Sequence, residues 1–256
     1  MWAGAGDQWR MGLMRTEGAR VLVTGAARRV GRAIALELAG AGCDVVVHCH
    51  QSQAEARNVV EKIRRMGRQA ALVQADLGFE DSVRLVAQRS VENLGGLDVL
   101  VNNAAVFDGD ERVSGLCDWR RVFGVNVFAP AILVEQLTPA LRAGGGGKVV
   151  NLCDISAERP WPTHAAYCAS KSALVSLTRA WARRLAPDIQ VNGVAPGIAE
   201  FPADYPADVR EKLIARVPLR RAGSPRDIAS TVRFLIEHGD YITGQIINVD
   251  GGRSIR

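Results

Sequence analysis

A tyrosine and a lysine four positions apart, Tyr167 and Lys171, form the first pair whose types and spacing could do acid–base chemistry. Residues four apart lie on one face of a helix, so a phenol and an ammonium group would lie side by side there. A tyrosine titrates at about pH 10 in water, and a neighbouring positive charge lowers its pKa. The spacing therefore predicts a phenol that exchanges a proton with a substrate.

A carboxylic acid, Asp154, precedes Tyr167 by thirteen positions, and Ser156 follows that acid two residues later. A carboxyl group beside the phenol could relay a proton or accept hydrogen bonds from substrate N–H groups, and burial would raise its pKa. A serine hydroxyl would suit a carbonyl oxygen instead. Asp154 could also be a helix cap or a surface acid, so its role is open at this point.

Alternating strand-like and helix-like segments must position these groups. Short apolar runs predict seven strands, at 20–24, 44–49, 69–74, 97–103, 147–152, 189–196 and 245–250. Helical spacing lies between them, at 31–42, 53–66, 79–93, 117–142, 165–185 and 225–237. This order predicts one doubly wound α/β domain, 19–256, with a seven-stranded parallel sheet covered on both faces. Residues 1–18 would be a loose extension, and the irregular segment 198–224 is typical of a short substrate lid.

Composition excludes several other kinds of protein. The 256 residues carry a net charge of +5, and their basic runs are short and scattered, so no nucleic-acid partner is expected. Five cysteines without a C-x-x-C pattern argue against a disulfide framework or a metal site. No apolar run suggests a membrane span. We expect a cytoplasmic protein that acts on a small molecule.

A glycine-containing loop, "VTGAARRVGRAIA", joins the first strand to the first helix. The N-terminus of such a helix offers free N–H groups and a positive dipole to a phosphate. Gly25 and Gly31 would let the backbone approach a pyrophosphate, although tight strand–helix packing would also require them. The position of the loop in a βαβ unit favours a dinucleotide.

The end of the second strand indicates which dinucleotide is bound. It carries no acid for a ribose 2′-hydroxyl, only the run His48, Cys49, His50, Gln51 and Ser52. Arg28 and Arg29 in the glycine loop supply the positive charge that a 2′-phosphate requires. Because like charges at a helix N-terminus oppose its dipole, a bound anion would compensate them. The sequence therefore favours NADPH over NADH.

Two further strand ends carry candidate ligands for the nucleotide. Asp76 follows the third strand, where it would either receive the adenine amino group or cap the next helix. Asn103 and Ala104 end the fourth strand, where small residues would let the adenosine lie close to the backbone.

Five motifs in order resemble the short-chain dehydrogenase/reductase family over residues 19–256. They are Thr-Gly-x-x-x-x-x-Gly (24–31), Asn-Asn-Ala (102–104), Tyr-x-x-x-Lys (167–171), Ala-Pro-Gly (195–197) and "ITGQIINVDGG" (242–252). The resemblance implies a Rossmann-type fold, a nicotinamide cofactor and a homotetramer.

Three departures from the common family pattern resemble one branch, the pteridine reductases. Arg29 replaces a glycine, Asp154 stands where the catalytic serine usually lies, and Ala105 and Phe107 follow Asn-Asn-Ala. The branch also has His-x-His-x-Ser (48–52), an acidic-Pro lid segment like "DYP" (204–206) and "VPL" (217–219). Gln51 departs from the branch, which often has a basic residue there.

The resemblance implies a role for each site residue. The catalytic set would be Asp154, Tyr167, Lys171 and Asn126, of which Lys171 also holds the nicotinamide ribose and Asn126 a water molecule. The substrate would lie against Arg29, Phe107, Asp154 and Tyr167. The cofactor would be bound by Gly25, Arg28, Arg29, Val30, Gly31, His48, His50, Ser52, Asp76, Leu77, Asn103, Ala104, Tyr167, Lys171, Pro196 and Gly197.

These roles favour a pterin as the substrate. Reduction of a ring C=N bond requires a proton at a ring nitrogen, which suits Asp154, and a flat ring could stack on Phe107. One alternative is a carbonyl/alcohol oxidoreductase, such as a 3-oxoacyl carrier-protein reductase, that uses Ser156 or Asp154. A non-catalytic dinucleotide sensor is another. An enoyl reductase fits less well, because that branch spaces its tyrosine and lysine by more than four residues.

Overall fold

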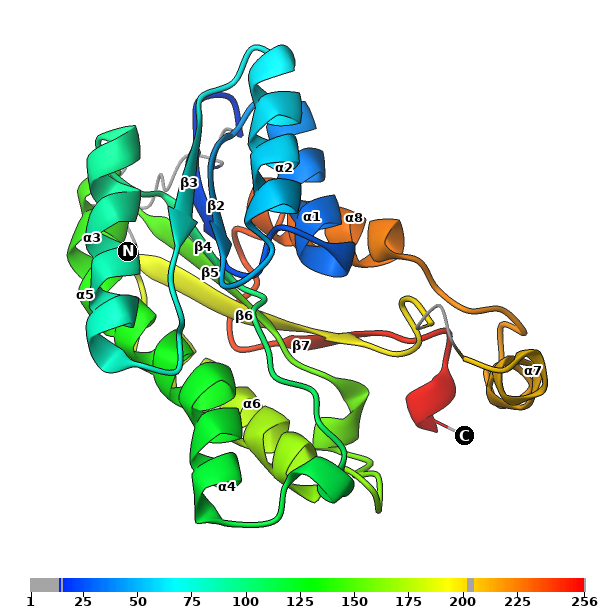
Figure 1. The fold of residues 1–256 in the computed structure, drawn as a ribbon. Coiled ribbons are helices and arrows are strands. Elements are labelled where there is room, and N and C mark those ends of the chain that lie inside the picture. Colours follow the sequence, from blue (N-terminus) through cyan, green and yellow to red (C-terminus); the bar gives the residue numbers. More distant parts are fainter. Residues whose placement is uncertain (1–13, 15, 202–204, 256) are drawn as a thin grey trace, which may run out of the picture.

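Seven parallel strands form one sheet in the computed structural model, which describes residues 14, 16–201 and 205–255. The strand order is β3-β2-β1-β4-β5-β6-β7 (Figure 1). The strands are β1 (Arg20–Val23), β2 (Asp44–Cys49), β3 (Ala70–Gln74), β4 (Val99–Asn102), β5 (Gly147–Leu152), β6 (Ile189–Pro196) and β7 (Ile246–Val249). The predicted fold class is confirmed, and each strand lies within one or two residues of its expected range or inside it.

Helices cover both faces of the sheet (Figure 1). One face is covered by α1 (Arg29–Gly40), α2 (Gln53–Arg65) and α8 (Pro225–Glu237). The other is covered by α3 (Glu80–Leu94), α5 (Ala129–Ala143) and α6 (Ala165–Leu185). The β-branched runs of the sequence arise from this arrangement, because a strand buried on both faces has no polar side to present to water.

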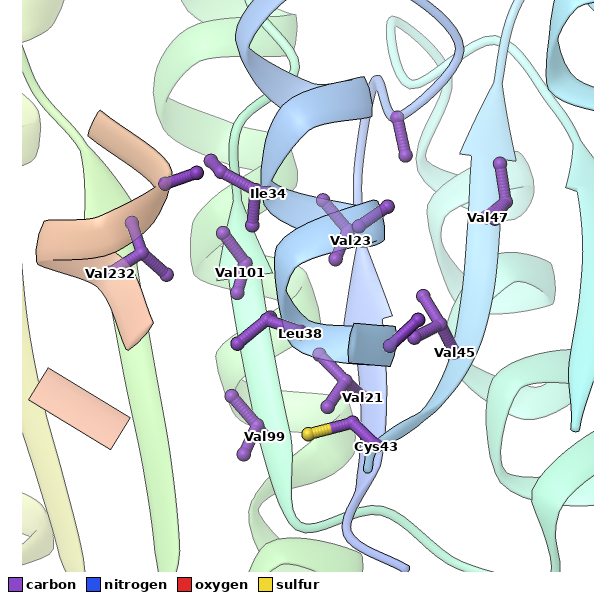
Figure 2. Packing of buried hydrophobic residues seen from close by; sticks show 14 of the residues in the cluster. Val21, Val23, Ile34, Leu38, Cys43, Val45, Val47, Val99, Val101 and Val232 are labelled. Carbon is purple, nitrogen blue, oxygen red and sulfur yellow. The ribbon is translucent and has the colours of Figure 1, made fainter. Parts of the chain in front are cut away.

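Alternate side chains of the strands build two separate cores. Val21 and Val23 of β1 point toward α1, together with Val45 of β2 and Val99 of β4, and meet Leu38 there (Figure 2). Leu22 of β1 points to the opposite face. This packing makes the sheet a rigid platform whose strand ends hold the loops.

The strand order reverses between β1 and β4, which places the ends of β1, β4, β5 and β6 along one edge. Val23 is paired with Val101, and Asn102 with Asn151, so these neighbouring strands end at nearly the same level. Ligands of open parallel sheets bind at this kind of reversal, beyond the carboxyl ends of the strands.

The helix expected at 117–142 is divided into three parts. An α-helix, α4 (Leu116–Phe123), runs into one π-helical turn at Gly124–Phe128 and then into α5. Hydrogen bonds that Asn126 makes to Val106, outside the helix, accompany the wider turn. Hydrophobic spacing carries no information about such bonds, so the sequence predicted one regular helix.

The same stretch, Leu116–Ala143, is the one span among the described residues that is long and apolar enough to cross a membrane. Half of its apolar window is buried inside the protein, where α5 packs on α3 and the sheet. Length and composition alone are weak evidence for a membrane span, and a core helix passes the same test.

The segment expected to be an irregular lid, 198–224, contains a helix, α7 (Ala207–Ile214). None of the residues of α7 is buried, which explains why the sequence has no apolar periodicity that would indicate this helix. Residues 202–204, which include the first residue of the acidic-Pro lid motif (204–206), lie outside the described residues, as do residues 1–13 and 15 of the expected extension. Thr16, from the end of that extension, is buried and donates a hydrogen bond to Glu237 of α8 at 3.2 Å.

Candidate active site

Tyr167 and Asp154 form a hydrogen bond at the end of β5. Tyr167 lies in the first turn of α6, and its phenol donates to Oδ2 of Asp154 at 2.9 Å. The other oxygen, Oδ1, accepts from the backbone N–H of Ser156 at 2.7 Å. Asp154 therefore begins the short 3₁₀ turn Ile155–Ala157 and faces the phenol at the same time.

Ser156 is fully buried, and its hydroxyl has no hydrogen-bond partner within the described part of the chain. The group next to the phenol is the carboxylate of Asp154, which is the arrangement that the thirteen-residue offset predicts. At the position next to the phenol the site therefore has a hydrogen-bond acceptor, the carboxylate, where a serine would provide a hydroxyl donor.

Burial dominates the electrostatics of the phenol. It raises the pKa of Tyr167 well above the ordinary value of 10.0, and the charge of Asp154 raises that pKa further. The expected lowering of this pKa by Lys171 is therefore outweighed by burial and by the carboxylate. Tyr167 is a protonated donor over the physiological pH range.

Lys171 lies beneath the tyrosine, one turn further along α6. Its Nζ donates to the carbonyl oxygen of Leu152 at 2.7 Å and lies 5.7 Å from the centroid of the Tyr167 ring. The side chain is fully buried, and burial lowers the pKa of Lys171 from 10.5. The predicted neighbours Tyr167 and Lys171 are thus brought together on one helix face.

Asn126 holds the segment after β4 against α6. Its Oδ1 accepts from Val106 N at 2.8 Å, and its Nδ2 donates to Val106 O at 3.0 Å and to Ser170 Oγ at 2.9 Å. Ser170 in turn donates to the carbonyl oxygen of Tyr167 at 2.6 Å. The side chain of Asn126 thus positions Val106 against α6, and its role in holding a water molecule stays a prediction.

Four rings, Phe107, Trp161, His164 and Tyr167, form an aromatic cluster at the mouth of the site. Phe107 stacks on His164 at 4.7 Å between ring centroids and meets the edge of Tyr167 at the same distance. Trp161 lies 6.3 Å from Tyr167, nearly parallel to it. Phe107 is 54% exposed, so it belongs to the site rather than to the core.

The glycine loop after β1 has a shape that side chains would prevent. Gly25 adopts a φ of 63°. A Cβ atom on Gly31 would lie 2.2 Å from the carbonyl oxygen of Gly25 and 2.4 Å from Nδ2 of Asn103. Asn103 fixes the loop by donating to the carbonyl oxygens of Thr24 and Gly25, at 2.8 and 3.1 Å. Close packing against Gly25 and Asn103 therefore also requires a glycine at position 31.

The N-terminus of α1 fits a phosphate group. Arg28 is its N-cap, no side chain in the described part of the chain forms a capping hydrogen bond, and its first turn contains no acidic residue. Free N–H groups and two arginines therefore face the same end of the helix. The chemistry of these residues suits a dinucleotide pyrophosphate.

Each of the two arginines lies next to an acidic side chain, on opposite sides of the loop. Arg28 donates from Nε to Glu55 of α2 at 2.8 Å. Arg29 has the left-handed φ of 50°, and its Nε lies 3.5 Å from Oε2 of Glu200, beyond β6. Both arginine side chains are more than half exposed, so they are free to turn toward a bound anion.

His48 differs from its predicted role as a cofactor ligand. It is buried, its Nδ1 accepts from Gly25 N at 3.1 Å, and its Nε2 lies 3.1 Å from the carbonyl oxygen of Ala75. Burial lowers the pKa of His48 to about 4, so the ring is neutral. With both nitrogens engaged by the protein, His48 braces the glycine loop and has no free atom for a phosphate.

The remaining predicted cofactor residues divide into surface, edge and core positions. His50 is exposed and lies 3.6 Å from Asp76, whose Oδ1 also caps the turn at Gly78 N at 2.9 Å. Residues lining the sheet edge, or the loops beside it, are Ser52, Asn103, Ala104, Pro196 and Gly197. Leu77 is buried in the core under α3, α5 and α6, and Val30 packs against the other core, under α1, α2 and α8, so both side chains stabilise the fold.

From the sequence, Trp161 and His164 are only candidate walls of the pocket, outside the catalytic set, and nothing indicates Arg253. Trp161 and His164 carried a weak signal, since both lie within six residues of Tyr167. Arg253 carried none, because only the folded chain brings it near Trp161, where its Cζ lies 5.7 Å from the ring centroid.

A phenol bonded to an acid above a buried lysine, next to a glycine-rich strand–helix turn, defines an oxidoreductase that uses a nicotinamide dinucleotide. A family model described as Enoyl-(Acyl carrier protein) reductase matches residues 25–254. The chain belongs to the short-chain dehydrogenase/reductase family.

Curated relatives in this family reduce or oxidise different substrates. The 3-oxoacyl-[acyl-carrier-protein] reductase FabG of Staphylococcus epidermidis is 36% identical over 237 residues, which are 90% of this chain and 97% of that protein. The 7alpha-hydroxysteroid dehydrogenase of Escherichia coli is 32% identical over 244 residues, which are 93% of this chain and 95% of that one.

Solved structures are similar over nearly the whole chain. FolM Alternative dihydrofolate reductase 1 from Brucella suis, in complex with NADP, is 38% identical with a TM-score of 0.84, covering 93% of this chain and 96% of that one. A blue fluorescent protein from a metagenomic library, in complex with NADPH, is 33% identical with a TM-score of 0.87, covering 93% and 99%. The predicted family and its nicotinamide dinucleotide are confirmed.

Proposed function

We propose that this protein is an NADPH-dependent reductase of a pterin. The observation that carries the proposal is the 2.9 Å hydrogen bond between Tyr167 and Asp154, because it puts a carboxylate where related carbonyl reductases usually have a serine. A pterin ring presents N–H and amino groups, which a carboxylate accepts well. The similarity to FolM Alternative dihydrofolate reductase 1 supports the same substrate class.

The residues of the site divide the chemistry between them. NADPH supplies a hydride to a carbon of the ring C=N bond. Tyr167, kept protonated by burial, holds the proton that the ring nitrogen requires, and Asp154 orients the ring and relays that proton. The amino group of Lys171 lies beneath the phenol, 5.7 Å from the ring centroid of Tyr167, and it would hold the nicotinamide ribose.

The glycine loop would hold the cofactor. The pyrophosphate would lie on the N-terminus of α1, and the 2′-phosphate near Arg28, His50 and Ser52. No acid ends β2 to repel that phosphate. Complexes of similar proteins with NADP and NADPH support the choice of this dinucleotide.

Phe107 would stack on the outer face of the substrate ring. Its exposure of 54% leaves a free ring surface beside Tyr167. Stacking of aromatic rings contributes about 0.5–1.5 kcal/mol beyond burial. Arg29, released from Glu200, would reach the pyrophosphate and the pterin oxygen together.

The comparisons favour a second candidate, a 3-oxoacyl carrier-protein reductase, more directly than the first. FabG proteins are 36% identical over 90% of this chain. In that function Tyr167 would protonate a carbonyl oxygen, while Asp154 would have to take over from the usual serine.

A substrate panel separates the two candidates. The purified protein is mixed with NADPH and either a dihydropterin, dihydrofolate or a 3-oxoacyl thioester, and loss of NADPH absorbance is followed. We expect turnover with a dihydropterin and a loss of roughly a hundredfold or more in Asp154→Ser, as for removal of a group that acts on the proton. Turnover of the thioester alone, or its rise in Asp154→Ser, would support the carrier-protein reductase.

We also propose that the protein is a homotetramer. Trp119 and Phe128, on α4 and the π-turn, are exposed large rings on one helical stretch, and Leu116 extends their surface. Exposed apolar surfaces of this kind mark contacts between subunits. Light scattering after size-exclusion chromatography tests the state, with Phe128→Asp as the variant that should dissociate it.

A further inference from the structure

The turn after β7 holds Arg253 in a defined place. Oδ1 of Asp250 accepts from Gly252 N at 2.9 Å, and Oδ2 accepts from Ser254 N at 2.6 Å. These bonds fold Arg253–Ile255 into a 3₁₀ turn and lower the pKa of Asp250 despite its burial. Asp250 is therefore committed to the backbone, and Arg253 projects from an ordered turn.

The lid base at 217–219 packs against the same turn. Leu219 N donates to the carbonyl oxygen of Gly251 at 3.1 Å. A Cβ atom on Gly251 would lie 2.7 Å from Cγ1 of Val217, and the φ of Gly251 is 63°. Glycine thus permits the close approach of lid and turn, and the position of Arg253 is fixed by two segments.

The side chain of Arg253 reaches the aromatic cluster. Its Cζ lies 5.7 Å from the ring centroid of Trp161, which is nearly parallel to Tyr167 at 6.3 Å. Burial lowers the pKa of Arg253, and the negative charge of Asp154 opposes that lowering. The guanidinium group therefore borders the candidate active site.

No acid forms an ion pair with this guanidinium within residues 14, 16–201 and 205–255, although the charges of Asp154 and Asp250 act on its pKa. It makes neither an ion pair nor a side-chain hydrogen bond to any of them, although the residue is half-buried. Asp154 is bonded to Tyr167 and Ser156, and Asp250 to the turn. Burial lowers the pKa of Arg253 from 12.5, with a further contribution from the positive charge of Arg216. A half-buried cation with unused donors next to a site is what an anionic ligand requires.

We propose that Arg253 binds an anionic substituent, a carboxylate or a phosphate, on the substrate whose ring lies at Tyr167. The planar guanidinium can donate two parallel hydrogen bonds to either group, and Trp161 holds its face. The proposal rests on the proposed function for the ring, and it makes Arg253 a residue that selects charged substrates over neutral ones.

A matched pair of substrates tests the proposal. Dihydrofolate and its uncharged diamide carry the same ring and the same tail and differ only in two carboxylates, while a phosphorylated dihydropterin tests a phosphate. We expect Arg253→Gln to raise KM for dihydrofolate about tenfold or more, the scale of a lost charge-assisted hydrogen bond. KM for the diamide and kcat for both should change less than about twofold, since the reacting groups are untouched.

Two further variants make the result specific. Arg253→Lys keeps the positive charge but lacks the planar group that donates two parallel hydrogen bonds. It should therefore bind dihydrofolate more tightly than Arg253→Gln and less tightly than the wild type. Arg65→Gln, on the exposed face of α2, removes a positive charge far from the turn and should leave both KM values unchanged. Thermal unfolding of each variant shows whether the fold is kept.

The outcomes distinguish this inference from the proposed function. Equal effects of Arg253→Gln on dihydrofolate and its diamide would overturn the role of Arg253 while pterin reduction stands. A second outcome is that dihydrofolate binds the NADP complex in calorimetry, binds the Arg253→Gln variant more weakly, and is never reduced. This result would overturn the pterin reductase function and keep the anion site. Failure of dihydrofolate, its diamide and the phosphorylated dihydropterin alike to bind or react would overturn both.

Discussion

The backbone N–H of Gly25 donates to Nδ1 of His48, which ties the glycine loop after β1 to the end of β2. The opposite nitrogen of the ring lies 3.1 Å from the carbonyl oxygen of Ala75, after β3. One neutral histidine thus joins three neighbouring strand ends. The loop that would receive the pyrophosphate is shaped by this contact before any ligand arrives.

His48 should make stability depend on pH. Its pKa falls from 6.5 to about 4 on folding, because burial disfavours the charged ring, so the unfolded chain binds a proton at a higher pH than the folded one. The stabilisation from His48 is therefore complete above pH 6.5 and is lost as pH falls from 6.5 toward 4. Such a shift corresponds to roughly 3 kcal/mol.

Urea unfolding of the wild type and of His48→Asn, followed from about pH 7 to about pH 4, measures this effect. The free energy of unfolding of the wild type should fall by about 3 kcal/mol more than that of the variant. Parallel curves for the two proteins would show that His48 does not titrate in this range.

Gly31, in the first turn of α1, and Gly40, its last residue, should respond oppositely to alanine. In Gly31→Ala the new Cβ would meet the carbonyl oxygen of Gly25 at 2.2 Å, and backbone at that position cannot move without opening the loop. We expect a loss of about 1–3 kcal/mol, as for other overpacked sites, and more than about tenfold weaker NADPH binding.

In the control Gly40→Ala, the new Cβ meets no atom of the described residues within 4 Å. Alanine should stabilise α1 there by up to about 1 kcal/mol, since glycine loses more conformational freedom on folding. Thermal unfolding and NADPH fluorescence titration provide both readouts. Unchanged NADPH binding in Gly31→Ala would mean that the loop does not hold the cofactor.

Tyr167→Phe should remove the reaction and keep the site. The ring would still pack between Phe107 and Trp161, so the cluster remains, and only the bond to Asp154 is lost. The turnover number should fall by roughly 10²–10⁴, while the dissociation constant of NADPH stays within about twofold. Stopped-flow turnover and fluorescence titration measure the two quantities, and retained turnover would assign the proton to another group.

Much of this arrangement follows from local sequence. The runs at Val45–Val47 and Val99–Val101 predict buried strands because each residue must be apolar on whichever face it lies. The offset between Asp154 and Tyr167 predicts their contact because β5 fixes one and the first turn of α6 fixes the other. Both inferences use only the period of an element and the position of its end.

The rest depends on contacts between distant segments. A histidine at position 48 can bind a phosphate or brace a loop, and the choice depends on which backbone groups of Gly25 and Ala75 approach it. The π-turn at Asn126 depends in the same way on Val106. Arg253 comes near Trp161 only after Asp250 and the lid base have folded its turn. Periodicity and motif spacing contain none of these distances.

Asn126 should affect substrate binding through Phe107, which follows Val106 directly. Asn126→Ala removes three hydrogen bonds and leaves the partly buried amide of Val106 without this acceptor. The free energy of unfolding should fall by about 2–4 kcal/mol, as for the loss of a buried hydrogen-bond network. KM for the ring substrate should rise severalfold, because Phe107 loses its fixed position, while NADPH binding stays unchanged.

The control Asn93→Ala breaks a single exposed hydrogen bond to Arg89 on α3 and should alter neither the free energy of unfolding nor KM. A KM that stays constant while stability falls would limit Asn126 to the fold, and a weaker NADPH complex would place its effect at Lys171 instead.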